Sequence, residues 1–228
     1  MLTRELSITI LGATGVGKTT LIKRIKGEDI EDISPTTQIE VHSKRIKLKS
    51  QQYKSALSLE KYRTYKVMAV DCPGDMSLWP YWKKAMQDYK TNGIIFMIDP
   101  TQDTKVQIDA LTQVSNYFLM TLDNDIVKAE RKARKAKAIF FLVVNKIDLL
   151  DFSKAKADEY LRENFKAAWE HLKERYPRSF HGWEAISALK GGEEMYDRID
   201  GIFEIISGVK FPICGMSLVI TLSTIFLI

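Results

Sequence analysis

Hydrophobic and polar residues alternate along the chain in blocks that predict strands and helices in turn. Continuous apolar runs at residues 6–11, 93–98 and 139–144 are bounded by turn residues, which is typical of buried parallel strands. Residues 39–49 alternate between apolar and polar well enough for an antiparallel edge strand, and residues 65–70 predict a further strand. These five segments are the expected framework of a sheet.

Helices are predicted between these strands. The first runs from Lys18 to about Lys26 and is closed by Gly27. A stripe of apolar residues predicts a long core-facing helix before the strand at 139–144, formed by Val106, Ala110, Leu111, Val114, Phe118, Leu119 and Leu122. One more helix is expected over residues 153–176, with a single apolar face made of Leu161, Phe165, Ala168, Trp169 and Leu172.

A short strand at residues 183–187 and a final helix at 193–206, ended by Gly208, complete the pattern. The alternation predicts an α/β fold, a doubly wound, mostly parallel six-stranded sheet with one antiparallel edge strand and helices on both faces. Ligands of such sheets bind beyond the carboxyl ends of the strands. We assign residues 1–208 to this domain and residues 209–228 to an apolar tail.

The first predicted strand runs into Gly12, then four spacer residues, then Gly17, Lys18 and Thr19. This spacing, after a strand and at the start of a helix, is the pattern of a phosphate-binding P-loop. The backbone N–H groups of such a loop point at phosphate oxygens, its lysine reaches the β- and γ-phosphates, and its threonine hydroxyl ligates Mg²⁺. We expect a nucleoside triphosphate to contact Gly12, Thr14, Gly15, Val16, Gly17, Lys18, Thr19 and Thr20.

Three polar boxes follow later strands: Asp71-Cys72-Pro73-Gly74, Asn145-Lys146-Ile147-Asp148 and Ser187-Ala188-Leu189. Together with the P-loop and a threonine in the Ser34-Pro35-Thr36-Thr37 loop, they make the chain resemble the small GTPase family over nearly all of residues 6–206. The strings PTTQIEV (35–41) and WPYW (79–82) are similar to the two switch regions of its Arf-like branch. The resemblance implies a P-loop G-domain fold, GTP and GDP as ligands, and Mg²⁺.

The resemblance also implies roles in recognition of the base. The Asp148 carboxylate is expected to accept hydrogen bonds from the N1–H and amino group of guanine, an edge that adenine lacks, which discriminates by ~10⁴-fold or more. Asn145 should brace the loop, and the stem of Lys146 should lie over the base. The remaining base contacts are expected from Ser187, Ala188, whose N–H would donate to guanine O6, and Leu189.

On the phosphate side, the resemblance implies that Thr19, Thr36 and, through a water molecule, Asp71 hold Mg²⁺. The Gly74 N–H is expected to contact the γ-phosphate. Thr37 is the competing ligand; we favour Thr36 because a threonine directly after proline fits the family pattern. The contacts of Thr36 and Gly74 would vanish on hydrolysis, which predicts a switch between GTP and GDP states.

Lys18, Gly74 and Asp75 are the candidate catalytic residues, and Asp75 stands where the family usually has a water-positioning glutamine. Its shorter, negatively charged side chain would face an anionic γ-phosphate, so we predict slow GTP hydrolysis. Thr14, where many relatives have glycine, would crowd an arginine finger. The implied partners are an effector, an exchange factor and an activating protein that completes the site. The alternative is a hydrolysis-impaired, nucleotide-locked scaffold or receptor subunit.

Composition changes this picture little: 45% of the residues are hydrophobic, 28% are charged and the net charge is +5. Much of the basic excess lies at residues 128–137, where no aromatic residue is interleaved for base stacking. We therefore expect a solvated helix end there and no binding of nucleic acid. Cys72 and Cys214 have no metal or redox spacing, which predicts free thiols in a reducing, cytoplasmic compartment.

The tail is the second informative stretch, because residues 211–228 carry no charge and directly follow Lys210. A membrane-spanning helix needs ~20 apolar residues, with a lower limit of about 17. The tail predicts a C-terminal membrane anchor with the domain on the cytoplasmic face. The alternatives are an apolar extension packed on the domain or a partner, and a non-native terminus. Met1 to Glu5 are too few and too polar for a cleavable signal.

Overall fold

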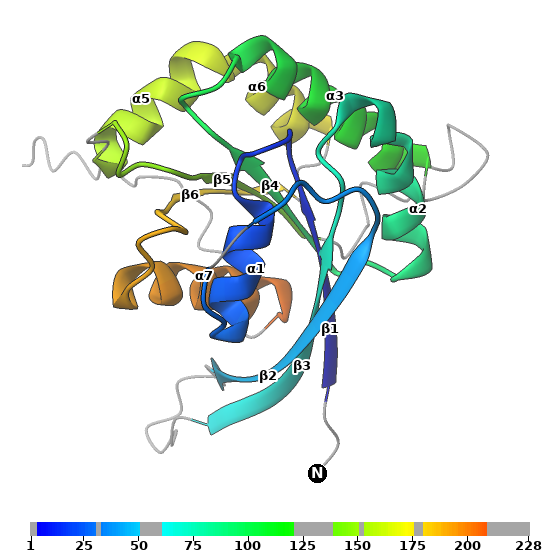
Figure 1. Ribbon diagram of the computed structural model, residues 1–228, viewed down its shortest axis with the longest axis vertical. Coiled ribbons are helices and arrows are strands. Elements are labelled where there is room, and N and C mark those ends of the chain that lie inside the picture. Colours follow the sequence, from blue (N-terminus) through cyan, green and yellow to red (C-terminus); the bar gives the residue numbers. More distant parts are fainter. Residues whose placement is uncertain are drawn as a thin grey trace, which may run out of the picture.

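Six strands form one sheet in the order β2-β3-β1-β4-β5-β6 in a computed structural model that describes residues 4–30, 33–50, 61–120, 139–150, 153–175 and 180–208 (Figure 1). All neighbouring strands run parallel except the edge strand β2, which is antiparallel to β3. The predicted doubly wound sheet is therefore confirmed. Its strands are β1 (Arg4–Leu11), β2 (Glu40–Ser50), β3 (Lys61–Asp71), β4 (Gly93–Ile98), β5 (Ile139–Val144) and β6 (Phe180–Ala185).

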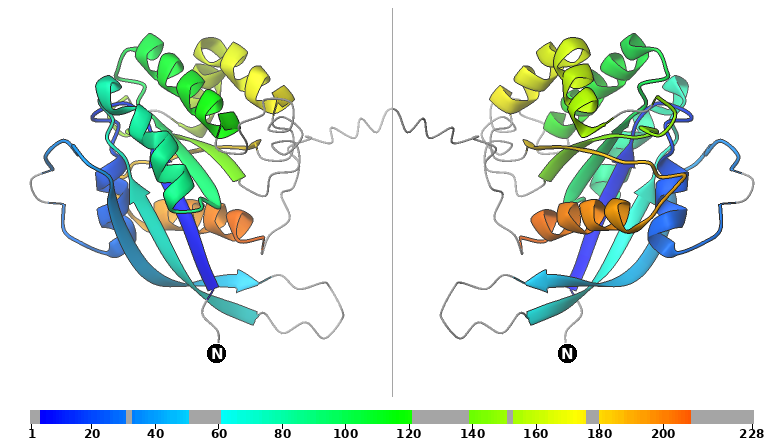
Figure 2. Two further views of the ribbon diagram at one scale, coloured as in Figure 1. Left: turned by 90° about the vertical axis from the view of Figure 1, so that its right-hand side faces the viewer. Right: turned by 90° about the vertical axis from the view of Figure 1, so that its left-hand side faces the viewer.

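Helices cover both faces of the sheet (Figures 1 and 2). One face packs against α1 (Lys18–Lys26) and α7 (Glu193–Ile206), whose apolar residues share a core cluster with Ile8, Ile10 and Val67. The other face is covered by α2 (Pro80–Asp88), α3 (Thr104–Met120), α5 (Lys154–Asn164) and α6 (Lys166–Arg175). A short 3-10 helix, η1 (Met76–Leu78), precedes α2.

The register of the sheet brings the carboxyl ends of the parallel strands to one edge. Ile10 pairs with Asp71, Leu11 with Phe96, and Ile98 with Val144. The residues that directly follow these ends therefore emerge side by side, although they are far apart in the chain: Gly12, Cys72, Asp99 and Asn145. This is the edge at which the fold predicts a ligand.

The prediction of one long helix over residues 153–176 is wrong, because the structure has two helices there, α5 and α6. The division lies at Phe165, which ends α5 with φ −115° and is almost fully buried. The Asn164 side-chain amide donates to the carbonyl of Tyr160, 2.9 Å away, and so offers that carbonyl a partner other than a helical N–H. The break leaves Leu161, Phe165 and Leu172 buried in one core.

Two further expectations fail locally. Val106 is 38% exposed, whereas its neighbour Gln107 is fully buried, because adjacent residues of a helix lie about 100° apart and the Gln107 amide is bonded inside the fold. The strand predicted at 183–187 is β6, which begins at Phe180 and ends at Ala185. A register irregularity and the positive φ of Gly182 interrupt its alternation, which hides its start from the sequence.

Other expectations fall outside the described residues: the basic run at 128–137, the connection at 51–60, Leu122, and the tail at 209–228 with Cys214. The side chains of Phe118 and Leu119 are also outside the description. None of the helices formed by the described residues combines the length and apolar character that a bilayer crossing requires.

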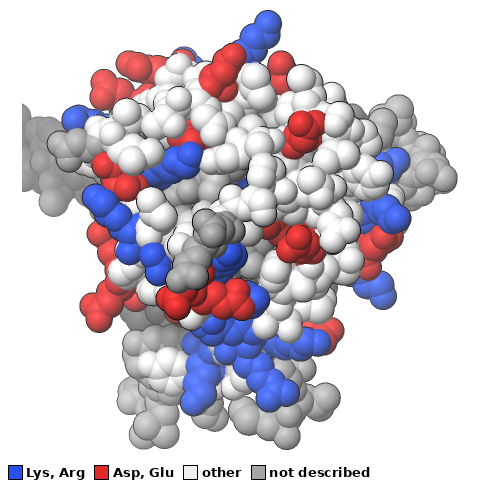
Figure 3. All heavy atoms as spheres, viewed as in Figure 1, with Lys and Arg blue, Asp and Glu red and all other residues white. Residues whose placement is uncertain are grey.

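Basic side chains gather over the outer part of β2 (Figure 3). Lys44, Arg45 and Lys47 are exposed there. The antiparallel pairing places this part of β2 toward the outer end of β3, since Lys47 pairs with Thr64 while Glu40 pairs with Asp71. The basic surface therefore lies away from the carboxyl-end edge of the sheet.

Candidate functional site

The loop between β1 and α1 requires glycine at two of its positions. Gly12 has φ +141°, and a Cβ there would lie 2.5 Å from the carbonyl oxygen of Met97. Gly17 has φ +97°, and a Cβ there would lie 2.3 Å from the side-chain amide of Asn145. Both positions combine a left-handed backbone with a close neighbour, so only glycine fits. The loop can therefore curl tightly between β4 and the residues after β5.

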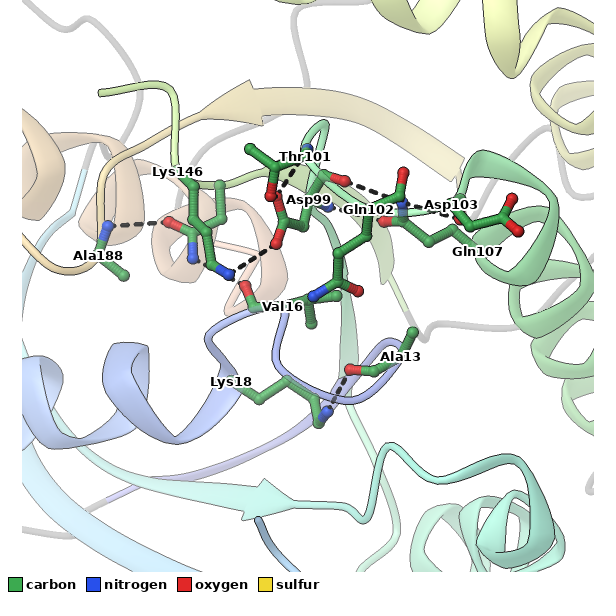
Figure 4. Close-up of polar contacts among 11 residues, drawn as sticks. Ala13, Val16, Lys18, Asp99, Thr101, Gln102, Asp103, Gln107, Lys146 and Ala188 are labelled. Atoms are coloured by element: carbon green, nitrogen blue, oxygen red, sulfur yellow. Dashed lines mark hydrogen bonds and ion pairs between the residues drawn. The ribbon is translucent and has the colours of Figure 1, made fainter. Parts of the chain in front are cut away.

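Lys18 points back into this loop (Figure 4). Its ammonium donates to the carbonyl oxygens of Gly12 at 3.0 Å and Ala13 at 2.9 Å, and the residue is only 6% exposed. Burial lowers the pKa of Lys18 to about 8, and the nearby Asp71 carboxylate opposes that shift. A buried cation inside a ring of backbone groups is suited to an anionic ligand.

Three oxygen-bearing side chains from separate segments converge beside Lys18. The Thr19 hydroxyl donates to Asp71 Oδ2 at 2.7 Å and lies 3.0 Å from the Thr36 hydroxyl. Thr36 Oγ1 is 3.4 Å from the same carboxylate oxygen, whereas Thr37 is exposed. The structure therefore brings together the three predicted metal ligands.

This cluster passes a chemical test for a hard divalent cation. Asp71 is fully buried, and its Oδ1 accepts no hydrogen bond from any residue that the structure describes. Burial raises the pKa of Asp71, while the Thr19 hydrogen bond and the charge of Lys18 lower it. Hydroxyl and carboxylate oxygens are the ligands that Mg²⁺ prefers, and Mg²⁺ is commonly held by few protein groups plus phosphates. A cation nearby would also supply the orphaned Oδ1 with a charge partner.

The segment after β3 contacts the loop between β1 and α1, called the glycine loop below, at Gly74. A Cβ on Gly74 would lie 2.6 Å from Thr14 N, from the carbonyl carbon of Ala13 and from the Lys18 ammonium. Two buried indoles fix the segment from behind: Trp79 donates to the Gly74 carbonyl at 3.0 Å and Trp82 to the Pro73 carbonyl at 2.7 Å. The close approach and the two indole hydrogen bonds hold residues 73–74 against the loop.

Asp75 is exposed, and its carboxylate is engaged within its own segment. Its Oδ1 accepts hydrogen bonds from the Ser77 backbone N–H at 2.9 Å and the Ser77 hydroxyl at 2.5 Å, so it caps η1. These hydrogen bonds lower the pKa of Asp75, which keeps the side chain ionised. The negative charge that the sequence analysis predicts at this position is therefore present, and its geometry is that of a helix cap.

Asn145 joins three loops on the other side of the site. It is 2% exposed, donates from Nδ2 to the carbonyl of Val16 at 2.8 Å, and accepts at Oδ1 from the N–H of Ala188 at 2.9 Å. Figure 4 shows Val16 and Ala188 on either side of this junction. The Ala188 N–H that the sequence assigns to guanine O6 thus donates to Asn145 here, and its assignment to guanine stays a prediction.

The remaining predicted base residues surround this junction. Lys146 has φ +60°, and its ammonium lies 2.7 Å from Asp99 Oδ2. Asp148 lines a cavity of about 520 Å³, together with Ser153, Ser187 and Lys190. Leu189 is 57% exposed beside it. The cavity contains no residue of the glycine loop, so it adjoins the junction on the β6 side.

The sequence analysis did not identify three residues of the site. Arg24 of α1 donates to the carbonyls of Ala188 at 3.3 Å and Leu189 at 2.6 Å, which ties that loop to the helix after the glycine loop. Asp99 and Gln107 form a buried pair at the end of β4. Asp99 directly follows a predicted strand, so the rule that ligands bind at strand ends would have found it. Arg24 carries no such signal.

The chain is similar to one family of known proteins. The model of a family described as the ADP-ribosylation factor family matches residues 1–175. The chain is 28% identical over 187 residues to ADP-ribosylation factor-like protein 3 of Caenorhabditis elegans. The matched residues are 82% of this chain and 80% of that protein. It is 27% identical over 146 residues to ADP-ribosylation factor-like protein 2 of Drosophila melanogaster, covering 64% and 62%.

A third relative is ADP-ribosylation factor-like protein 2 of Dictyostelium discoideum, 28% identical over 103 residues, which are 45% of this chain and 46% of that protein. The chain thus spans less than two thirds of two of the curated relatives that it matches.

Proposed function

Because the chain belongs to the ADP-ribosylation factor family as an Arf-like small GTPase, we propose that it binds guanine nucleotide with Mg²⁺ and alternates between a GTP state and a GDP state. The observation that carries this proposal is the convergence of Lys18, Thr19, Thr36 and Asp71 at the carboxyl-end edge of the sheet. We assign this function to residues 1–208.

The site supports binding of a triphosphate in three ways. The left-handed glycines curl the loop around a phosphate, and the buried Lys18 ammonium supplies a positive charge inside it. Thr19 and Thr36, with Asp71 behind them, would hold Mg²⁺, and the ion would neutralise phosphate charge. Residues 36 and 74 approach this point from two separate loops, so both loops can sense the third phosphate.

The identity of the nucleotide can be tested directly. We expect the purified protein to carry GDP, GTP or both, released by denaturation and identified by anion-exchange chromatography. Following the ratio of the two over several hours then separates a cycling switch from a nucleotide-locked scaffold. A protein that releases only adenine nucleotides would contradict the proposal.

Thr36→Ala is expected to weaken binding of GTP with Mg²⁺ and to leave GDP binding almost unchanged. The lost hydroxyl is expected to reach the bound Mg²⁺ only when the third phosphate is present. Polar contacts to charged groups are worth about 1.5–3 kcal/mol, or roughly tenfold to hundredfold in affinity. Thr37→Ala is the matched control, because Thr37 is exposed beside it. Calorimetric titration measures both affinities, and a larger defect in Thr37→Ala would reverse the assignment.

We also propose that hydrolysis is slow without a partner. In hydrolysis a water molecule attacks the γ-phosphorus in line, the bond to the β–γ bridging oxygen breaks, and GDP and inorganic phosphate leave. Lys18 is suited to stabilise the charge on the transferred group. Asp75 is ionised and bonded to Ser77, so it supplies no long neutral amide to orient the water.

Single-turnover hydrolysis of bound GTP is therefore expected to be slower than the ~10⁻⁴ s⁻¹ of an unassisted small GTPase. Asp75→Gln should be faster, because the longer neutral side chain reaches the water. Asp75→Asn is the control: it keeps an oxygen to cap η1 and removes only the charge. GTP hydrolysis by the wild type above that rate, or slower hydrolysis by Asp75→Gln than by the wild type, would contradict this proposal.

The rival proposal, a nucleotide-locked scaffold or receptor subunit, is favoured by one feature. Trp79 and Trp82 hold the carbonyls of Gly74 and Pro73, which restrains the loop that a switch must release. In that case the protein would retain its nucleotide unconverted in the experiment above, and Asp75→Gln would not accelerate its conversion.

A further inference from the structure

We propose that Asp99 is a positioning residue for guanine-nucleotide binding, which holds Lys146 across the base site and is itself held by Gln107 of α3. This inference rests on the proposed function, since it concerns the same site. The inference goes beyond the proposed function because Asp99 and Gln107 belong to none of the sequence motifs that predict nucleotide binding.

The first step is the burial of a charge. Asp99 is 0% exposed and directly follows β4 at the carboxyl-end edge of the sheet. Within the described part of the chain its Oδ2 accepts no well-aligned hydrogen bond, and the Lys146 ammonium lies 2.7 Å away as its counter-ion. A fully buried carboxylate is strongly disfavoured unless it is paired. Asp99 and Lys146 therefore depend on each other.

The second step is the fixing of Asp99 on its other sides (Figure 4). Its Oδ1 accepts from the backbone N–H of Thr101 at 2.9 Å and from the Thr101 hydroxyl at 2.7 Å. The fully buried Gln107 amide bridges the Asp99 backbone: it accepts from the N–H at 2.7 Å and donates to the carbonyl at 2.9 Å. Neither the carboxylate nor its backbone is free to rotate.

The third step is the conformation of Lys146. Its φ of +60° is uncommon for a residue with a side chain and is retained only where the surroundings enforce it. The preceding residue, Asn145, is tied to Val16 and Ala188, and the Lys146 ammonium is tied to Asp99. The methylene stem between these two anchors is thus held in place before a ligand arrives.

The fixed position of the Lys146 methylene stem has a specific consequence for nucleotide binding. Lysine stems cover apolar surfaces with their methylene groups, and a side chain that is already ordered loses less freedom when a ligand binds. The base is common to GDP and GTP, so loss of Asp99 should accelerate the release of both nucleotides by the same factor. Loss of the Thr36 hydroxyl, in contrast, would affect mainly GTP.

The experiment measures the dissociation of GDP and of a non-hydrolysable GTP analogue from the full chain. Asp99→Asn keeps the shape and the acceptor for Thr101 and removes the charge that pairs with Lys146. We expect both nucleotides to dissociate about tenfold to hundredfold faster. The matched control is Asp103→Asn, the same chemical change at an exposed residue of the same loop whose Oδ1 caps the N–H of Lys105. Its rates should equal those of the wild type within twofold.

A double-mutant cycle with Lys146→Met separates positioning from a general structural role. Lys146→Met leaves Asp99 buried without a counter-ion, so its melting temperature should fall, and adding Asp99→Asn should raise it again. In the Lys146→Met background, Asp99→Asn should change nucleotide dissociation by less than twofold. That comparison remains decisive even if Asp99→Asn alone fails to fold, because the double variant has no buried unpaired charge.

Each outcome decides the question. If Asp99→Asn accelerates dissociation equally in the wild-type and Lys146→Met backgrounds, Asp99 does not act through Lys146 and the inference is overturned. Unchanged dissociation in Asp99→Asn overturns it as well, and so does a defect confined to the GTP analogue. If the wild type binds neither nucleotide, it is the proposed function that fails, and the wild-type control reports this separately.

Discussion

Asp148→Asn is expected to lower the affinity for GTP by about 10³- to 10⁴-fold, the largest effect of any change that leaves the phosphate site intact. A carboxylate accepts two hydrogen bonds from the N1–H and amino group of guanine, whereas an amide offers one acceptor and one donor. The NH₂ group of the introduced amide would then face the guanine amino group, so that two hydrogen-bond donors would point at each other. The same variant should gain affinity for XTP, whose base has an oxygen at that position.

Competition of GTP, XTP and ATP against a fluorescent guanine nucleotide measures this change. Asp158→Asn is the control, because Asp158 is a carboxylate of the neighbouring α5 whose partner is Arg162, at 2.6 Å. Its nucleotide preference should remain that of the wild type. Equal losses for GTP and XTP in Asp148→Asn would show that residue 148 supports the loop without reading the base.

Lys18→Met is expected to lower the affinity for GDP and GTP by about 10²- to 10⁴-fold. The methionine fills the same space but removes the ammonium that would contact two phosphates, and each charge-assisted hydrogen bond is worth about 1.5–3 kcal/mol. Calorimetric titration measures the loss, and circular dichroism verifies that the variant is folded. An affinity within tenfold of the wild type would mean that the glycine loop does not hold the phosphates through Lys18.

The pH dependence of the wild type provides a second test of Lys18. Burial lowers its pKa to about 8 in the protein without nucleotide. Phosphates bind the protonated ammonium, so the affinity should be nearly constant between about pH 7 and pH 8 and fall as the pH rises above 8, by up to about tenfold per pH unit. Lys18→Met should lack this fall between pH 8 and 9. An affinity that rises over this range in the wild type would contradict the assignment.

The parts that the sequence predicts well are those specified by local chemistry. Gly12 and Gly17 are needed where they stand because their backbone is left-handed, and α1 begins at Lys18 and ends at Lys26 as expected. The continuous apolar runs of β4 and β5 are confirmed to the residue. The topology then follows, because parallel strands joined by helices present their carboxyl ends at one edge.

The parts that the sequence does not predict depend on contacts between distant residues. The break at Phe165 depends on how two helices pack on one core, and the burial of Gln107 depends on the backbone of Asp99. The indole of Trp79 reaches back to Gly74, and Arg24 reaches a loop 164 residues further along the chain. Periodicity gives no information on such long-range polar contacts.

The most direct test of the central claim is a calorimetric titration of the nucleotide-free protein with GTP and with ATP in the presence of Mg²⁺. We expect GTP to bind at least about 10³-fold more tightly than ATP, because the carboxylate of Asp148 is proposed to select the base. Equal affinities for the two nucleotides, or no binding of either, would contradict it.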